Sequence, residues 1–262
     1  MVFRHAPPRR FDLVIGADGL HSGVRAAAFG PEEQFVKPLG LYTAWFTAPA
    51  FDDLDGWYQT YNHPGGLVAS IRPGRISTQS KAALSFRPRR GEIIRYDRRD
   101  RAAQLALLDK RFAGAGWHTA RLLEAAHAAP DFSFDTMAQV ELDRWWTGRV
   151  ALIGDGAACP SPLSGLGTSV ALVGAYVVAG ELGAGAEHAA AFEEYDRIVR
   201  PFATGAQQLA GGTGGFAPMN GLTLRLVQAS MSWATRWPIR GFMEKQFSKS
   251  TDIELPYYPS GL

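Results

Sequence analysis

Two short apolar runs, each followed at once by a glycine-aspartate turn, constrain the fold of this chain most strongly. The first run, 11–15, leads into Gly16-Ala17-Asp18-Gly19, and the second, 149–153, leads into Gly154-Asp155-Gly156. Apolar runs of this length that are bounded by turn residues are typical of buried strands. Open α/β sheets bind their ligands at the carboxyl ends of the strands. The two turns are therefore the first candidates for a binding site.

The first turn carries residues that suit a polar ligand. Its glycines allow the backbone to approach a ligand closely, and the Asp18 carboxylate can accept hydrogen bonds from hydroxyl groups. Arg25 falls about two turns into the helix expected over 21–29, where it can pair with a carboxylate or a phosphate. A tight turn held by the aspartate side chain explains the same residues without a ligand.

The second turn opens a loop that suits negative charge. A Gly/Pro-rich stretch, 160–167, leads directly into a helix, so free backbone N–H groups and the helix dipole meet at its start. A dinucleotide fingerprint is excluded here, because its sixth position is Cys159 and no second strand ends in an acidic residue about 20 positions later.

The remaining pattern predicts a sheet followed by helices. Between residues 39 and 135 aromatic and polar residues alternate, which predicts one antiparallel sheet with strands at 41–46, 67–71 and 81–86. Helices are expected over 101–112 and 119–127. Long helices are expected after the second turn and over 186–210, and terminal helices with Leu222, Leu226, Met231, Trp233 and Trp237 precede an extended tail.

Composition narrows the class of protein. With 27 basic and 25 acidic residues, the formal net charge is +2, so nothing indicates nucleic acid or an anionic membrane as a partner. The single Cys159 excludes a disulfide framework, and the six histidines lack paired ligand spacing, so no metal site is expected. Without a cleavable signal or a long apolar run, we expect a cytoplasmic protein that acts on a small molecule.

The two motifs together resemble those of the group A flavoprotein monooxygenases, the family of para-hydroxybenzoate hydroxylase and the tetracycline-inactivating hydroxylases. The matching segments are 15–19 with His21, Ser22 and Arg25, then 148–155, 162–167, 195–201 and the tail around 255–257. The resemblance implies a mixed α/β fold, in which the remnant of an FAD-binding Rossmann-like domain is interleaved with an antiparallel-sheet substrate domain. It places FAD-domain segments at 1–37 and 146–216, the substrate domain at 38–145, and C-terminal helices and a tail at 217–262.

The resemblance also implies which residues bind the cofactor and the substrate. Residues expected to bind FAD, and to serve NAD(P)H as reductant, are Asp18, Gly19, Arg25, Gly154, Asp155, Pro162, Leu163, Ser164, Gly165, Leu166 and Gly167. The sheet is expected to cover the flavin and to shape a substrate pocket with Trp45, Phe46, Trp57, Tyr58 and Phe86. Each of these aromatic residues, taken singly, also suits the core of a half-buried sheet.

Two departures from the family pattern affect the expected function. The usual Gly-Asp-Ala-Ala becomes Gly154-Asp155-Gly156-Ala157-Ala158, which loosens the backbone after the aspartate. The family also begins with a Gly-x-Gly-x-x-Gly βαβ unit of about 30 residues that holds the ADP half of FAD. This sequence shows no such unit, so a truncated member with an open sheet edge is expected. A separate N-terminal chain, a second copy or a local rearrangement would cover that edge.

The implied activity is hydroxylation of an aromatic or polyketide-like molecule, with electrons from NAD(P)H, FAD as cofactor and dioxygen as the oxygen source. No side chain is an obvious catalytic acid or base. One alternative is a redox-inactive homologue that binds a ligand or performs cofactor-free chemistry. Another is one half of a split enzyme whose second half supplies the ADP site.

Overall fold

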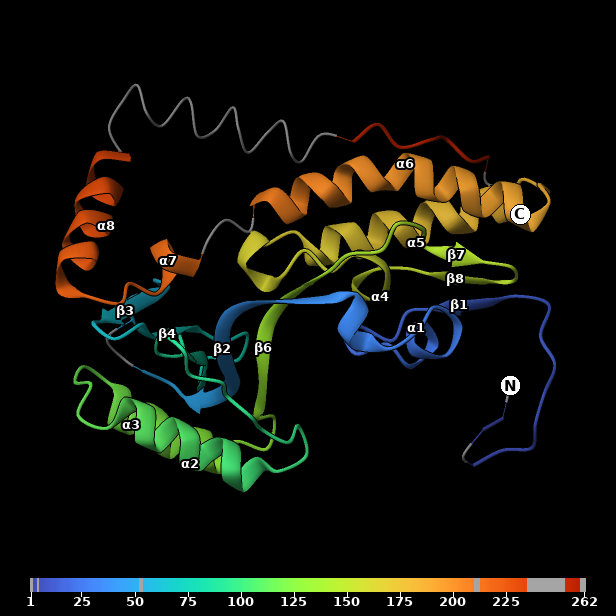
Figure 1. Ribbon diagram of the computed structural model, residues 1–262. Coiled ribbons are helices and arrows are strands. Elements are labelled where there is room, and N and C mark those ends of the chain that lie inside the picture. Colours follow the sequence, from blue (N-terminus) through green and yellow to red (C-terminus); the bar gives the residue numbers. More distant parts are fainter. Residues whose placement is uncertain (1, 4, 52–53, 210–212, 235–252, 260–262) are drawn as a thin grey trace. The chain divides into compact units, whose positions relative to one another are not determined.

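The computed structural model describes residues 2–3, 5–51, 54–209, 213–234 and 253–259, which form two compact units (Figure 1). The first unit contains Met1–Lys37, Ala138–Gly211 and the end of the chain, and the second contains Pro38–Met137 and the segment with α7 (Thr213–Phe216) and α8 (Gly221–Ala234). Two of the points at which the chain passes between the units lie inside strands, β2 (Val36–Pro49) and β6 (Ser133–Val140). Each unit is therefore assembled from segments that are far apart in the sequence.

The first unit is built on a three-stranded sheet with the order β1-β8-β7. Strand β1 (Val14–Gly16) runs parallel to β8 (Val150–Leu152), with Val14 opposite Val150 and Gly16 opposite Leu152. Strand β7 (Trp146–Thr147) pairs with β8 in the antiparallel sense. Because β1 and β8 are parallel, the two glycine-aspartate turns follow their strands at the same end of the sheet, as the expected α/β fold requires.

The first apolar run is less buried than its sequence predicts. The strand begins at Val14 rather than Phe11, and Phe11 and Ile15 are 44% and 37% exposed. Within the described residues β1 pairs only with β8, so it is an edge strand and has fewer covering neighbours than a central strand. The expected burial of this run was therefore wrong.

Two long helices complete the first unit, α5 (Gly167–Gly183) and α6 (His188–Leu209). They pack against each other over Gly174, where an added Cβ would lie 3.5 Å from the hydroxyl oxygen of Tyr195. Tyr195 is buried and donates a 2.9 Å hydrogen bond to the carbonyl oxygen of Leu152 in β8. Gly174 thus allows a close approach of α5 to α6, and α6 in turn holds the central strand.

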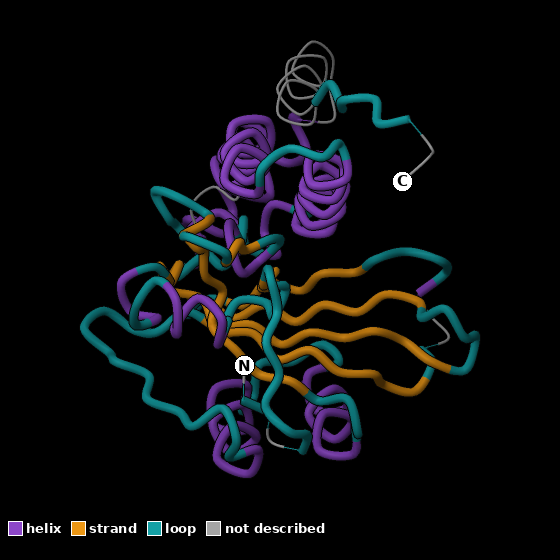
Figure 2. Tube along the Cα trace, turned by 90° about the vertical axis from the view of Figure 1, so that its right-hand side faces the viewer, coloured by secondary structure: helices purple, strands orange, loops and turns teal. Residues whose placement is uncertain are grey.

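The second unit is a five-stranded sheet with the order β3-β4-β5-β2-β6, covered on one face by helices (Figure 2). The strands β3 (Gln59–His63), β4 (Leu67–Pro73) and β5 (Gln79–Phe86) form antiparallel pairs, and β5 also pairs with β2. This confirms the antiparallel sheet expected from the sequence. The covering helices are α2 (Arg101–Phe112) and α3 (Thr119–Ala128), and their apolar residues meet Phe46, Ile71 and Leu84 in one core.

The boundary between the units differs from the expected one. Residues 138–145, expected in the substrate domain, belong to the first unit. The reason is packing, because Val140, Leu142 and Trp145 are buried in the core of that unit with Ala151 and Leu152. Of the expected terminal helices, α7 and α8 are seen, whereas Trp237 lies outside the described residues.

Among the described residues, no helix combines the length and apolar character that crossing a bilayer requires. The same part of the chain contains no group of three or more His, Cys, Asp or Glu side chains that could hold a metal ion.

The hydroxyl of Tyr195 offers a test of how α6 holds the sheet. Replacing Tyr195 by Phe removes the hydrogen bond to the Leu152 carbonyl from a buried site, so we expect the free energy of unfolding to fall by about 1 kcal/mol. The matched control is Tyr176→Phe, which removes an exposed hydroxyl that donates to Pro256 and should change stability by less than about 0.5 kcal/mol. Urea unfolding measures both, and equal effects would contradict the role given to Tyr195.

Candidate functional site

The two glycine-aspartate turns meet where β1 and β8 end. The N–H of Ile153 donates to the carbonyl oxygen of Gly16 at 2.9 Å, which continues the parallel pairing into the turns. A Cβ at Gly16 would lie 2.7 Å from Leu152 Cδ2 and 2.9 Å from Val24 Cβ, so only glycine fits between the neighbouring strand and helix α1 (Gly23–Ala28). The sequence predicted that this glycine lets the backbone approach a ligand closely. In the structure, the groups that approach Gly16 closely are the side chains of Leu152 and Val24.

Asp18 holds the first turn of α1. Its Oδ1 accepts a 2.5 Å hydrogen bond from the Ser22 hydroxyl, and its Oδ2 accepts one from the N–H of Val24 at 3.0 Å. Burial by itself would raise the pKa of the Asp18 carboxyl, but the hydrogen bonds from Ser22 and Val24 outweigh it and lower the pKa below its usual value. The carboxylate is thus ionised at neutral pH. These contacts match the tight-turn interpretation, and cofactor contacts of Asp18 and Gly19 stay predictions.

Arg25 is fully buried and braces the two turns against each other. Its Nη1 donates to the carbonyl oxygen of Gly156 at 3.1 Å and its Nη2 to that of Leu20 at 2.5 Å, while its Nε has no partner among the described residues. Burial lowers the pKa of the guanidinium, and the carboxylates of Glu32 and Asp18 oppose that shift. The expected pairing with a ligand carboxylate or phosphate stays a prediction, because both of these hydrogen bonds are made to backbone carbonyls.

The second turn depends on Gly154, which has φ 57° and ψ −139° and precedes the short helix α4 (Asp155–Ala158). Side chains rarely adopt this conformation, and a Cβ there would lie 3.1 Å from the Cβ of Ala171. Glycine thus allows the chain to turn directly into Asp155. The Asp155 Oδ1 lies 3.7 Å from the position that a Cβ of Gly167 would occupy. The carboxylate therefore reaches the start of α5.

The loop between α4 and α5 exposes the amino end of a long helix. It contains the 3-10 helix η3 (Pro162–Ser164), and the Ser164 hydroxyl accepts a 3.1 Å hydrogen bond from the N–H of Leu166. No side chain caps α5, and the N–H groups of its first residues, 167–169, have no acceptor within the described part of the chain. Such amide groups and the helix dipole stabilise negative charge. The loop residues 162–166 lead directly into this amino end, and their cofactor contacts, including those of Leu163, stay predictions.

Cys159 follows α4 directly, and its buried surroundings make its thiol unreactive. Burial first, and then the Asp155 carboxylate, raise the pKa of its thiol to about 12. The thiol stays protonated at neutral pH, so Cys159 acts as a buried apolar residue rather than as a nucleophile.

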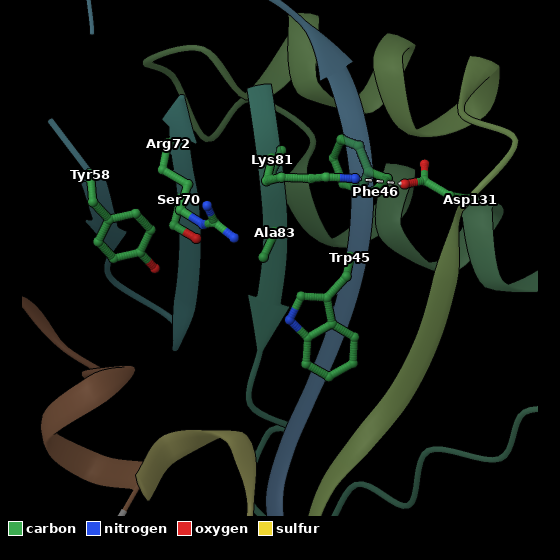
Figure 3. Close-up of a pocket in the computed structure, with 9 residues that line it drawn as sticks. Trp45, Phe46, Tyr58, Ser70, Arg72, Lys81, Ala83 and Asp131 are labelled. Carbon is green, nitrogen blue, oxygen red and sulfur yellow. Dashed lines mark hydrogen bonds and ion pairs between the residues drawn. The ribbon is translucent and has the colours of Figure 1, made fainter. Parts of the chain in front are cut away.

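A cavity of about 520 Å³ opens on the face of the second sheet that the helices leave uncovered (Figure 3). Of the aromatic residues predicted for the substrate pocket, Trp45 and Tyr58 line it, whereas Phe46 borders it but has its ring in the core on the other face of the sheet. Trp57 and Phe86 do not line it. Trp57 is 71% exposed, and Phe86 is fully buried in the core, stacked on Tyr42 at a ring distance of 5.5 Å. Successive residues of a strand face opposite sides of a sheet, so Phe86 points to the helices.

Sequence reasoning missed the polar residues of this cavity, namely Ser70, Arg72, Lys81 and Asp131. Lys81 Nζ donates to Asp131 Oδ2 at 3.1 Å and to the Thr47 hydroxyl at 2.5 Å. The Thr47 hydroxyl also donates to Asp131, which lowers the pKa of that carboxyl to about 2 despite the opposing effect of burial. The alternation along β4 and β5 was the available signal, because it places Arg72 and Lys81 on one face.

Comparison with known proteins shows the family of the chain. The family described as FAD binding domain matches residues 10–210. An uncharacterized protein of Mycobacterium tuberculosis is 52% identical over 196 residues, which cover 74% of this chain and 52% of that protein. A flavin-dependent monooxygenase of Legionella longbeachae is 35% identical over 209 residues, 79% of this chain and 53% of that enzyme. The chain thus spans about half the length of these curated relatives.

Solved structures share the fold. The tetracycline destructase Tet(55) superposes with a TM-score of 0.77 and 33% identity, covering 98% of this chain and 65% of that one. HpxO of Klebsiella pneumoniae, solved with FAD and uric acid, has a TM-score of 0.64 and 22% identity and covers 90% of this chain and 60% of that one. The second likeness concerns the fold alone.

The two glycines that flank Asp155 should respond to substitution in opposite ways. Gly154→Ala places a Cβ in a backbone conformation reserved for glycine, so we expect it to lower the free energy of unfolding by about 2 kcal/mol. Gly156→Ala should instead raise stability by up to about 1 kcal/mol, since alanine restricts the unfolded chain. The added Cβ would meet no atom closer than the Gly16 oxygen at 3.5 Å. Denaturant unfolding of both variants measures the difference, and a Gly154→Ala variant as stable as the parent would contradict it.

Proposed function

This chain belongs to the FAD-binding family of flavin-dependent monooxygenases, and from that premise we propose that it carries the flavin site and the substrate sheet of an NAD(P)H-dependent hydroxylase. The proposed substrate is an aromatic or polyketide-like small molecule. The observation that carries the proposal is the meeting of the Asp155 carboxylate with the uncapped amino end of α5, directly after the paired strands β1 and β8.

The described residues of this site fit FAD. Gly165 has φ 71°, and no atom lies within 4 Å of the place its Cβ would take, so the loop backbone is open to a flat ring system. The N–H groups at the start of α5 would stabilise the negative charge of the reduced flavin. The Asp155 carboxylate would accept hydrogen bonds from the hydroxyl groups of the ribityl chain of FAD. When bound, FAD supplies the redox chemistry that activates dioxygen.

The residues around the proposed flavin site would position the cofactor rather than transfer protons. Cys159 is kept as a neutral thiol, and Arg25 is enclosed by the protein and holds the Gly156 carbonyl. The chain's part in the reaction is therefore to bind the cofactor, to orient it through backbone donors and to hold the substrate in a fixed position.

The size and lining of the cavity in the second unit suit a planar substrate. Its volume of about 520 Å³ lies within the range of small-molecule sites, and its lining combines Trp45 and Tyr58 with a few polar side chains. Indole and phenol rings bind flat apolar molecules by stacking. The name of the related tetracycline destructase states that it acts on tetracycline, a precedent for a polycyclic substrate in a protein of this fold.

We also propose that a further strand pairs with the free edge of β1. Within the described residues this edge has no partner, and Ile15 beside it is 37% exposed. Unpaired edges of this kind recruit strands from other segments or chains. An N-terminal chain that carries the ADP site, or a second copy of this chain, would serve this purpose.

Flavin binding tests the proposed function. We expect the purified chain to retain yellow FAD on gel filtration, either alone or after co-expression with an N-terminal partner that completes the sheet. Asp155→Asn should weaken FAD binding about tenfold, because a charged acceptor is lost, whereas Asp143→Asn on the surface should leave it unchanged. Visible absorption and quenching of flavin fluorescence measure both variants. A folded chain that stays colourless with excess FAD in both settings would favour the redox-inactive alternative and refute the proposal.

A further inference from the structure

We infer that the second unit carries a further binding site, a cavity on the helix-covered side of its sheet that takes a phosphate monoester with a compact apolar group. This basic cavity has a volume of about 460 Å³ and lies where the β3–β4 turn, the residues after β5 and the end of α2 come together. The inference does not rest on the proposed function, since it concerns the other side of the sheet.

The alternation of side chains separates the basic cavity from the cavity on the open face. Leu67, at the start of β4, lines the basic cavity and belongs to the core that the helices cover, and His63 lies opposite it in the register of β3 and β4. Ser70 and Arg72, which line the open-face cavity, occupy positions of β4 at odd separations from Leu67. They therefore point to the opposite face, and the sheet lies between the two cavities.

The basic cavity has more positive than negative charge. Apart from His63, its charged lining residues are Arg89, Glu92, Lys110 and Arg111, so three cations accompany one carboxylate. The carboxyl end of α2, which contributes to the lining, adds about half a negative charge through the helix dipole. More than one positive charge therefore stays uncompensated.

The carboxylate of the basic cavity is fully engaged. Oε1 of Glu92 pairs with the Arg111 guanidinium, and Oε2 accepts a 2.8 Å hydrogen bond from the N–H of Arg89. These hydrogen bonds lower the pKa of the Glu92 carboxyl, so it is ionised at neutral pH. The Arg111 guanidinium lies 4.8 Å from the centre of the Phe86 ring, and its side chain is 12% exposed. Arg111 and Glu92 thus form a fixed, mutually neutralised wall.

Lys110 and Arg89 provide the charge that remains. The Lys110 ammonium group has no hydrogen bond or ion pair within the described part of the chain. The Arg89 guanidinium makes no hydrogen bond among the same residues, and its charge acts on Glu92 only from a distance. Two cations at one cavity repel each other, and a phosphate monoester carries close to two negative charges at neutral pH. A singly charged anion would compensate only one of the two cations.

The rest of the lining suits an apolar group. Leu67 is 8% exposed, Leu107 packs against the core from α2, and Met219 borders the cavity from the segment after α7. The carbonyl oxygen of Met219 accepts a 2.8 Å hydrogen bond from the N–H of Gly65, which ties this segment to the β3–β4 turn. A cavity of this volume is in the range of small-molecule sites, and methionine side chains adapt to the shape of a ligand. An organic phosphate therefore fits better than free phosphate.

Two probes of similar shape and different charge test the inference. Phenyl phosphate and phenyl sulfate are titrated into the full chain by isothermal titration calorimetry at about pH 8, without added flavin. The phosphate ester is then a dianion, because its second pKa is about 6, whereas the sulfate ester is a monoanion. We expect phenyl phosphate to bind about tenfold more tightly than phenyl sulfate. Inorganic phosphate should bind more weakly than phenyl phosphate, since it lacks the apolar group.

Substitutions locate the site. Lys110→Gln and Arg89→Gln should each remove most of the preference for phosphate over sulfate without loss of folding, since both side chains are exposed. The matched control is Arg95→Gln, which removes the same charge from an exposed arginine outside the basic cavity and should retain the preference. Circular dichroism verifies the fold of each variant.

Five results would overturn the inference. The parent chain could bind the two esters equally, or bind neither of them while folded. Inorganic phosphate could bind as tightly as phenyl phosphate. The Arg95 variant could lose the preference as fully as the Lys110 variant. Finally, Arg72→Gln could abolish the preference while Lys110→Gln retains it, which would place the ligand in the open-face cavity. Because the titrations omit flavin, each of these results leaves the FAD-binding test unaffected.

Discussion

The parallel pairing of β1 with β8 is the constraint on which the rest of the first unit depends. Strand β1 lies near the start of the sequence and β8 near its middle, and their pairing brings together two turns that are separated in sequence by residues 38–137 of the second unit. Arg25 secures this junction by bonding to the Gly156 carbonyl, 131 residues away. Burying a guanidinium is costly unless it forms hydrogen bonds, so the carbonyl oxygens of Gly156 and Leu20 stabilise the buried Arg25 while Arg25 holds the two turns together.

The second unit shows how one sheet serves packing and binding at the same time. One face supplies the core with Phe46, Ile71 and Leu84 beneath the two helices. The opposite face carries Ser70, Lys81 and Arg72, whose polar groups would be costly in a core but suit a cavity open to water. The alternation of side chains along each strand is therefore enough to give a rigid foundation and a polar binding surface from the same backbone.

The features predicted best from the sequence are those that depend on residues close together in the chain. The α/β character, the antiparallel sheet and the bounds of α2 follow from apolar spacing and turn residues, and the structure confirms them. The burial of Arg25 could not be predicted, because it depends on carbonyl groups contributed by Leu20 and by the distant Gly156. The face to which Phe86 points, and the residues that lie beside Arg72, depend on the register of β2, β4 and β5. Alternation of side chains along a strand does not determine this register. The limit of the second unit falls inside β6, where no change of composition marks it.

The passage of the chain from one unit to the other inside β2 and β6 has a consequence for how such a protein can vary during evolution. A loop tolerates insertions and deletions, whereas a strand has a fixed count of residues between its two ends. Loss of one residue before Trp45 would exchange the faces of Trp45 and Phe46, sending the indole into the core and the phenyl ring into the cavity. Changes of length should therefore be confined to the turns of the sheet, while the crossing strands diverge only by substitution.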